Sequence, residues 1–333
     1  LAGLPDPEPA VGRRELEGGL VVEERRRPVG VIGANYEARP NVTVDCAALC
    51  IKSGNAAVLR GSADTLASNR ALLAAVHAAL TAVGLPTAAV GLIDSPDRAE
   101  VEAMLGLNEL IDLIIPRGGA ALHQRCRQQS RIPVITGGIG ICHLYAAASV
   151  EIDRALPLID NAKTQRPSVC NALDTVLADR RIAAALLPAV VERLAAKGVR
   201  FRAEPEAFAI VGAHPAVQPA GADDFDTEWL GLTLGLKVVD GVEAAIAHIQ
   251  QHSTGHSDGI LSADPAEVAT FLHAIDSAAV YVNASTRFTD GSQFGLGAEI
   301  AVSTQRIHAR GPMALEALTS YKWVAIGDYA VRP

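Results

Sequence analysis

Short apolar runs alternate with amphipathic stretches along the first part of the chain. The clearest stretch is residues 65–83, where leucines and valines recur three to four positions apart, as on one face of a helix. Ser62 or Asp64 can cap this helix, and Gly84 with Pro86 ends it. The predicted strands of this block are residues 29–34, 56–59, 88–93, 111–115 and 133–136, and its predicted helices are residues 41–51, 65–83, 97–105 and 120–129.

A second block repeats the alternation. Its predicted helices are residues 150–161, 182–197, 242–252 and 265–275, and its predicted strands are residues 172–178, 232–239, 259–261 and 280–283. Strands and helices that alternate at this spacing form parallel α/β sheets, which bind ligands at the carboxyl ends of their strands. The pattern therefore predicts an α/β protein of two lobes with a cleft between them.

The first 28 residues fall outside this alternation. Residues 1–14 are punctuated by proline and glycine, which is typical of a connector. In residues 15–28, Gly18 and Gly19 precede three apolar residues and then five consecutive charged residues. This segment is either a hairpin, which protrudes or pairs with another subunit, or an exposed edge strand.

Composition narrows the class of protein. The chain has 333 residues and a mass of 34.7 kDa, enough for two domains of roughly 100–200 residues. It is 49% hydrophobic with a net charge of −8, which favours a large core and argues against nucleic acid or an anionic membrane as partner. The longest apolar run, residues 182–191, is about half a membrane span, and no signal-peptide pattern is present. Because the first residue is Leu1 rather than Met, we expect the chain to begin partway into a longer protein.

The five cysteines point to a reducing, cytoplasmic compartment, because their number is odd and their spacing irregular. Cys46 and Cys50 stand one helical turn apart, but no further ligands follow at zinc-site spacing, so we expect no metal. Cys170 differs from the others, because it lies in a polar loop with Lys163 and Arg166. Nearby cations favour the nucleophilic thiolate, whereas cysteines among apolar residues are usually core filler.

Glycine-containing turns supply candidates for an anion site. The three glycine-containing turns are at residues 53–55, 60–62 and 117–119. The last two follow predicted strands and precede predicted helices. Arg60 and Arg117 suit the extra phosphate of NADP, although the glycines can equally be simple turn residues. Late in the chain, Arg287 in a glycine-rich polar loop can hold a carboxylate or phosphate, or be an ordinary solvated arginine.

Three segments together carry a family resemblance. Residues 36–45 read YEARPNVTVD, residues 163–172 read KTQRPSVCNA, and residues 282–291 read VNASTRFTDG. With them, the chain resembles the gamma-glutamyl phosphate reductase (glutamate-5-semialdehyde dehydrogenase) family of the aldehyde dehydrogenase superfamily, from about Leu4 through Asp328.

The resemblance implies an aldehyde-dehydrogenase-like α/β fold: a Rossmann-like cofactor domain, an α/β catalytic domain and a small oligomerisation element. The implied divisions are a connector and oligomerisation hairpin at 1–28, an NADP-binding domain at 29–145 that lacks its N-terminal part, a catalytic domain at 146–310, and a C-terminal return and oligomerisation strand at 311–333. It also implies a homo-oligomer, and glutamate 5-kinase as a partner.

The implied reaction is the NADPH-dependent reduction of L-glutamyl 5-phosphate to L-glutamate 5-semialdehyde and phosphate, the second step of proline biosynthesis. Cys170 matches the nucleophile that forms a thioester, and the Cys170 backbone N–H with Asn171 are candidate oxyanion donors. The expected substrate clamps are Arg39, Lys163, Arg166 and Arg287, and the expected cofactor residues are Ser53, Arg60, Arg117, Gly118, Gly119 and Glu228.

Two alternatives remain. One is an aldehyde dehydrogenase that acts on another semialdehyde, but Thr136 and the glycines after it stand where such enzymes keep a catalytic glutamate. The other is a non-catalytic homologue that binds the preceding kinase. Its support is the short N-terminus and three departures from the family pattern, near Gly138, at Gly231 and at Gln293.

Overall fold

A computed structural model describes residues 1, 3–7, 10–37, 39–137 and 139–332. The chain divides into two compact units: the first is Leu1–Gly137 with Gly291–Pro333, and the second is Gly138–Asp290. Among the described residues, no helix is both long enough and apolar enough to span a bilayer.

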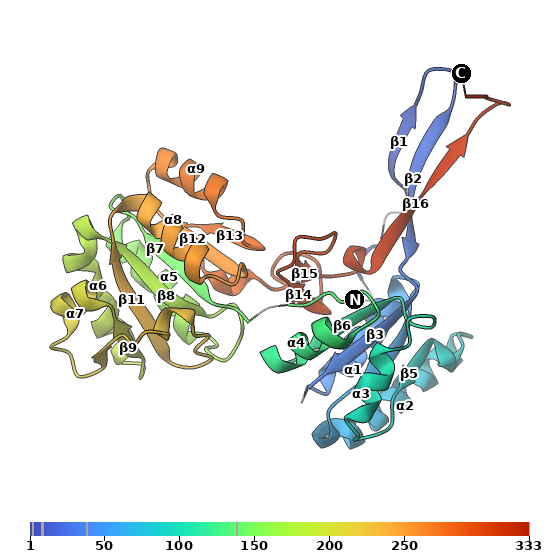
Figure 1. The fold of residues 1–333 in the computed structure, drawn as a ribbon, viewed down its shortest axis with the longest axis horizontal. Helices are drawn as coiled ribbons and strands as arrows, with labels where there is room; N and C mark the ends of the chain where they lie inside the picture. Colours follow the sequence, from blue (N-terminus) through green and yellow to red (C-terminus); the bar gives the residue numbers. More distant parts are fainter. Residues whose placement is uncertain (2, 8–9, 38, 138, 333) are drawn as a thin grey trace. The chain divides into compact units, whose positions relative to one another are not determined.

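A parallel four-stranded sheet forms the centre of the first unit (Figure 1). Its strands, in spatial order, are β5 (Val90–Leu92), β4 (Ala56–Arg60), β3 (Val31–Tyr36) and β6 (Leu113–Arg117). Its helices are α1 (Asn41–Lys52), α2 (Leu66–Ala82), α3 (Ala99–Leu105) and α4 (Ala120–Gln129), with short 3-10 turns at Ala63–Thr65 and Thr87–Ala89. Ile32 and Ala34 pack toward α1 and α2, and Val31 packs toward α3 and α4, as expected from strand alternation.

The N-terminal segment is a hairpin. Strand β1 (Ala10–Glu15) pairs antiparallel with β2 (Val21–Pro28) across a turn that contains Gly18 and Gly19, with φ of 90° and 78°. β2 is the middle strand of a three-stranded sheet, because β16 (Thr319–Ile326) pairs with its other side. Strands β14 (Ala301–Ser303) and β15 (Gly311–Met313) form a separate antiparallel pair, and a 3-10 turn covers Glu316–Leu318.

The second unit contains a parallel seven-stranded sheet. In spatial order its strands are β10 (Val217–Pro219), β9 (Arg200–Ala203), β11 (Thr233–Val239), β8 (Leu173–Asp179), β7 (Cys142–Ala146), β12 (Ser257–Leu261) and β13 (Ala279–Val282). Its helices are α5 (Ile152–Thr164), α6 (Arg180–Ala195), α7 (Pro205–Val211), α8 (Gly241–His252) and α9 (Pro265–Ala274), with 3-10 turns at Asp224–Asp226 and Thr286–Phe288.

Alternate residues of the central strands build two cores in this unit. Leu144 and Val176 pack with α5, α6 and α7, whereas Tyr145 and Leu177 pack with α8 and α9. Both faces of the sheet are covered (Figure 1), which explains why β8 is buried at every position.

The divisions between the units differ from the expected 145/146 and 310/311. Strand β7, which the sequence pattern does not predict, pairs with β8 and β12 and therefore belongs to the second unit. Residues 291–310 belong to the first unit, where β14 pairs with β15. Residues 133–136 form no strand but a single bridge, Ile114 to Val134.

Candidate functional site

Cys170 lies in the turn between α5 and β8, at the amino edge of the second sheet. Its carbonyl accepts a hydrogen bond from the Sγ–H of Cys142, the first residue of β7, at 3.2 Å. Gly140 packs against the same carbonyl so closely that a β-carbon there would lie 2.6 Å from the carbonyl carbon of Cys170. The backbone of Cys170 is therefore enclosed by the entry into β7.

Burial separates Cys170 from the other thiols. Cys170 is half-buried, whereas the remaining four cysteines are fully buried. Burial raises the pKa of Cys126 to about 11 and that of Cys50 to about 12, and it also raises the pKa of Cys46 and of Cys142 well above the ordinary value. These four thiols stay protonated at neutral pH, so Cys170 is the best candidate for a nucleophile.

Two of the expected cations lie near Cys170. Arg166 is exposed, and Arg287 is half-buried and donates to Gln165 Oε1 at 2.8 Å. Burial lowers the pKa of Arg287, the Cys170 thiolate acts against this lowering, and Arg166 adds to it. The two guanidinium groups and the thiol therefore share one electrostatic environment.

The side chains of Asn171 and Lys163 are not free for the expected roles of oxyanion donor and substrate clamp. The Nδ2 of Asn171 donates to the Thr289 carbonyl at 2.8 Å, so this donor is already engaged and is not directed at an oxyanion. Lys163 is completely buried and donates to the Leu173 carbonyl at 2.8 Å, so it has no exposed surface with which to clamp a substrate. Both side chains instead fix the chain on either side of Cys170.

Sequence reasoning missed a buried carboxylate beside this turn. Asp174 accepts hydrogen bonds from the backbone N–H of Cys142 and of Trp229, both at 3.2 Å. Glu228, expected at the cofactor ribose, accepts the N–H of Gly140 at 2.8 Å. The available signal was an aspartate inside a mostly apolar predicted strand, since a buried carboxylate needs specific partners.

A second buried network lies across β7 and β12. The Nδ1 of His143 bonds to Asp258 at 2.9 Å, and Asp258 also accepts from the Ser253 hydroxyl at 2.6 Å. The ring of His248 packs edge-on against His143, and neither of its nitrogens has a hydrogen-bond partner among the described residues. Burial lowers the pKa of His248 to about 2, so this ring is neutral in the folded protein.

Four of the six expected cofactor residues, Arg60, Arg117, Gly118 and Gly119, lie at the carboxyl edge of the first sheet. Arg60 ends β4 and Arg117 ends β6, on either side of β3, where the strand order reverses. The Nε atoms of both arginines are buried without a hydrogen-bond partner among the described residues. Unsatisfied donors of this kind fit an anionic ligand such as a dinucleotide phosphate.

A carboxylate occupies the glycine turn at this edge. Glu37, which follows β3, accepts the N–H of Gly119 at 2.8 Å, and a β-carbon on Gly118 would lie 2.6 Å from the carboxyl carbon of Glu37. The N–H group assigned to a phosphate is therefore held by Glu37, which sequence reasoning missed. Glu37 could have been noted, because it is the second residue of the first segment of the family resemblance.

Ser53 does not reach this edge. It follows α1 and precedes β4, so it lies at the amino edge of the first sheet. Its hydroxyl donates to the carbonyl of Leu49 at 2.7 Å and accepts from Asn55 at 2.7 Å, which ends the helix. Arg39 is exposed after β3 in the first unit, and Gly138 lies outside the described residues.

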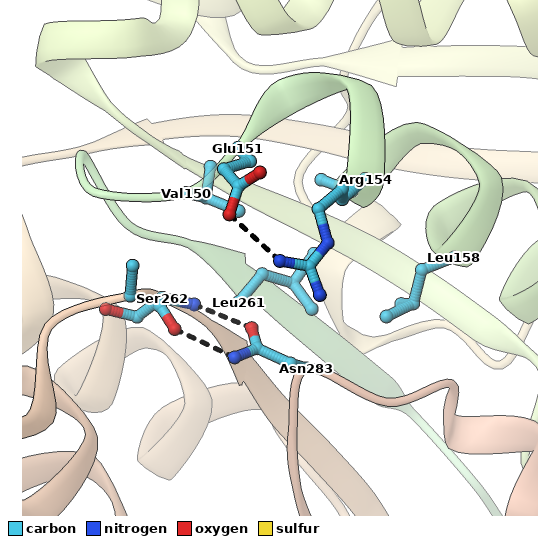
Figure 2. A pocket seen from close by; sticks show the side chains of 9 residues that line it. Val150, Glu151, Arg154, Leu158, Leu261, Ser262 and Asn283 are labelled. Atoms are coloured by element: carbon cyan, nitrogen blue, oxygen red, sulfur yellow. Dashed lines mark hydrogen bonds and ion pairs between the residues drawn. The ribbon is translucent and has the colours of Figure 1, made fainter.

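A cavity of about 300 Å³ lies at the other edge of the second sheet, away from Cys170. Figure 2 shows Asn283, just after β13, in paired hydrogen bonds with the backbone of Ser262, just after β12. Glu151 and Arg154 form an ion pair on its rim. Its polar groups satisfy one another, so it contributes nothing to the chemistry at Cys170. Within the described ranges, no group of three or more His, Cys, Asp or Glu side chains is arranged to hold a metal.

The chain is similar to known proteins along most of its length. A gamma-glutamyl phosphate reductase from Tolumonas auensis is 57% identical over 97% of this chain and 77% of that protein. The crystal structure of gamma-glutamyl phosphate reductase from Thermotoga maritima is 46% identical and matches 99% of this chain and 80% of that one with a TM-score of 0.96. No protein-family model matches.

More distant solved structures share the fold alone. An acetylating aldehyde dehydrogenase from Geobacillus thermoglucosidasius is 19% identical and matches 97% of this chain and 80% of that one with a TM-score of 0.74. An engineered glycolyl-CoA reductase with bound NADP+ is 17% identical and matches 95% of this chain and 78% of that one with a TM-score of 0.73. The α/β architecture is therefore that of the aldehyde dehydrogenases.

Proposed function

Because the chain belongs to the gamma-glutamyl phosphate reductase family, we propose that it reduces L-glutamyl 5-phosphate to L-glutamate 5-semialdehyde and phosphate, in proline biosynthesis. The observation that carries the proposal is the selective exposure of Cys170 beside Arg166 and Arg287, in a chain whose other thiols are buried. An acyl phosphate is an activated, anionic electrophile, so a thiolate flanked by cations suits it.

The chemistry follows from that arrangement. The Cys170 thiolate attacks the C5 carbonyl, and the bond from C5 to the phosphate oxygen breaks. Phosphate leaves, and C5 remains bound to the sulfur of Cys170 as a thioester. The backbone N–H of Cys170 is the remaining donor for the oxyanion, because the side-chain amide of Asn171 is engaged with Thr289. After reduction, the carbon–sulfur bond of the hemithioacetal breaks, which frees the aldehyde and restores the thiolate.

NADPH is the proposed reductant, and it supplies the hydride when bound. Arg60 and Arg117 fit its phosphates, because each has a buried Nε with no partner among the described residues. Gly118 and Gly119 allow close backbone approach if Glu37 releases the Gly119 N–H. Glu228 keeps its proposed role toward the nicotinamide ribose, and Ser53 is left out of the site because it lies at the opposite edge of its sheet.

Assembly and location are further proposals. The sheet of β1, β2 and β16 exposes Tyr321 and Trp323 at 56% and 52%, which supports a role in homo-oligomer contacts. Arg39 stays a proposed substrate clamp, and glutamate 5-kinase stays a proposed partner that rests on the family resemblance. The odd number and irregular spacing of the five cysteines are compatible with the cytoplasm.

The reverse reaction provides the test. The purified protein should reduce NADP+ with glutamate 5-semialdehyde only when phosphate is present, followed by absorbance at 340 nm. Cys170→Ala should abolish turnover, whereas Cys126→Ala, at a buried thiol of the first unit, should retain it. Turnover without phosphate would instead indicate an aldehyde dehydrogenase for another semialdehyde, and no turnover would favour a non-catalytic homologue.

A further inference from the structure

One buried carboxylate ties together the segments around Cys170. Asp174 is the second residue of β8 and is 2% exposed. Its Oδ2 accepts the N–H of Cys142 and its Oδ1 accepts the N–H of Trp229. Asp174 therefore joins the start of β7 and the segment at Trp229 to the strand that follows the nucleophile.

One joined segment contacts Cys170 directly, and the other reaches it through Gly140. Cys142 donates its Sγ–H to the Cys170 carbonyl at 3.2 Å. Glu228, next to Trp229, accepts the N–H of Gly140, and Gly140 packs against that same carbonyl. Both contacts on the Cys170 carbonyl thus come from residues 140–142, and Asp174 holds this segment directly at Cys142 and indirectly through Trp229 and Glu228.

The counter-charge of this carboxylate is also buried. Lys163 Nζ lies 3.9 Å from Asp174 Oδ1 and donates to the carbonyl of Leu173, with both charged side chains almost fully excluded from solvent. A buried ion pair stabilises a fold only weakly, because desolvation offsets its attraction. The place of this ion pair beside Cys170 therefore points to a role other than stability alone.

We propose that Asp174 is a positioning residue for Cys170, with Lys163 as its counter-charge. Asp174 acts through Cys142 and through the Glu228–Gly140 hydrogen bond, since its two oxygens are engaged with backbone N–H groups. The proposal deepens the proposed function, because it takes Cys170 as the nucleophile.

Protonation of Asp174 should loosen the turn. The ionisable groups that face it are Lys163 from α5, Cys142 from β7 and Glu228 from the segment before β11. Burial raises the pKa of Asp174 to about 6, while Lys163 acts to lower it. A protonated carboxyl loses an acceptor for the N–H of Cys142 or of Trp229, so the turn should be fully ordered only above this pH.

Trp229 provides a reporter that does not depend on activity. The chain has two tryptophans, and Trp323→Phe, which keeps an aromatic ring at an exposed position in the first unit, leaves Trp229 as the single tryptophan. In this background the emission of Trp229 should change with a midpoint near pH 6, and kcat should fall over the same range. Asp174→Asn should remove both transitions and lower kcat at pH 8 at least tenfold, with KM changed less than threefold.

Asp179→Asn is the matched control, because Asp179 is a buried carboxylate at the far end of the same strand and caps α6. It should lower the melting temperature but keep both transitions and kcat. Lys163→Met should move the Trp229 midpoint upward, because Lys163 lowers the pKa of Asp174. If Lys163→Met does not fold, the Lys163→Met/Asp174→Asn double variant, which carries neither charge, should fold with low kcat and no transition.

The results separate this proposal from the proposed function. A kcat of Asp174→Asn within twofold of the parent, or equal losses in Asp174→Asn and Asp179→Asn, would overturn the positioning role. A parent protein without reductase turnover overturns the proposed function instead. The Trp229 titration still tests whether Asp174 holds the segments at Cys142 and Trp229.

Discussion

Gly140→Ala tests whether contact with β7 sets the position of the nucleophile. A β-carbon at residue 140 would lie 2.6 Å from the carbonyl carbon of Cys170 and 3.0 Å from its α-carbon. Ordinary carbon contacts are about 3.5–4.0 Å, and the carbonyl oxygen of Cys170 would lie closer still, so one backbone segment must move by at least about 1 Å. A displacement of this size at a reacting group costs about 100-fold in rate, and overpacking costs about 1–3 kcal/mol of stability.

The assay compares kcat, the alkylation rate of Cys170 and the melting temperature. Gly212→Ala serves as control, because its β-carbon would crowd the Phe208 ring at 2.9 Å at the end of α7, in the same unit but away from Cys170. Both variants should lose stability, and only Gly140→Ala should lose about 100-fold in kcat. A Gly140→Ala protein with parental kcat would refute the argument that this contact positions Cys170.

Three further predictions concern charge. Hydrogen bonds from Lys197, Thr164 and Arg193 outweigh burial and hold the pKa of Asp160 below its usual value, so Asp160→Asn should cost about 1–3 kcal/mol at pH 7. That cost should vanish at acid pH, below about 4, as the pH falls through the lowered pKa of Asp160. If the parent and Asp160→Asn differ in urea-unfolding free energy by the same amount at every pH, the prediction is wrong. Burial lowers the pKa of His248 to about 2, so only the unfolded state takes up this proton as the pH falls below about 6.5. The free energy of unfolding should therefore fall by about 1.4 kcal/mol per pH unit. His248→Leu should remove this contribution, measured by unfolding between about pH 7 and 5. Arg287→Gln should raise the half-maximal pH of Cys170 alkylation by about 0.5–1 unit. Arg154→Gln, at the other edge of the sheet, should leave it unchanged. The same pH profile in Arg287→Gln and the parent would exclude Arg287 as an activator of Cys170.

Local pattern was sufficient for much of the fold. Helix α4 has the predicted bounds, and α1 begins at the predicted Asn41, because apolar periodicity and flanking turn residues are local signals. Strand β7 was missed, because its His143 appears polar in the sequence although it is fully buried. Its partner Asp258 lies 115 residues away, and no local pattern shows such a pair.

For the candidate site residues, exposure could be predicted only where it follows from local sequence. Cys170 could be selected because its surroundings are polar and cationic, whereas the other thiols stand in apolar segments. Lys163 was misplaced because a lysine in the last turn of a helix is usually solvated, and its burial depends on Leu173 and Asp174. Ser53 was misplaced because a serine before a strand has the same local pattern whether it ends a helix or binds a ligand.

The place of Cys170 in the fold explains why cations gather there. Ligands of parallel sheets usually meet the positive ends of helices at the carboxyl edge, but Cys170 follows the carboxyl end of α5, at the amino edge of its sheet. Side chains must therefore supply the positive potential, and Arg166 and Arg287 are the exposed and half-buried groups that can do so without a helix dipole.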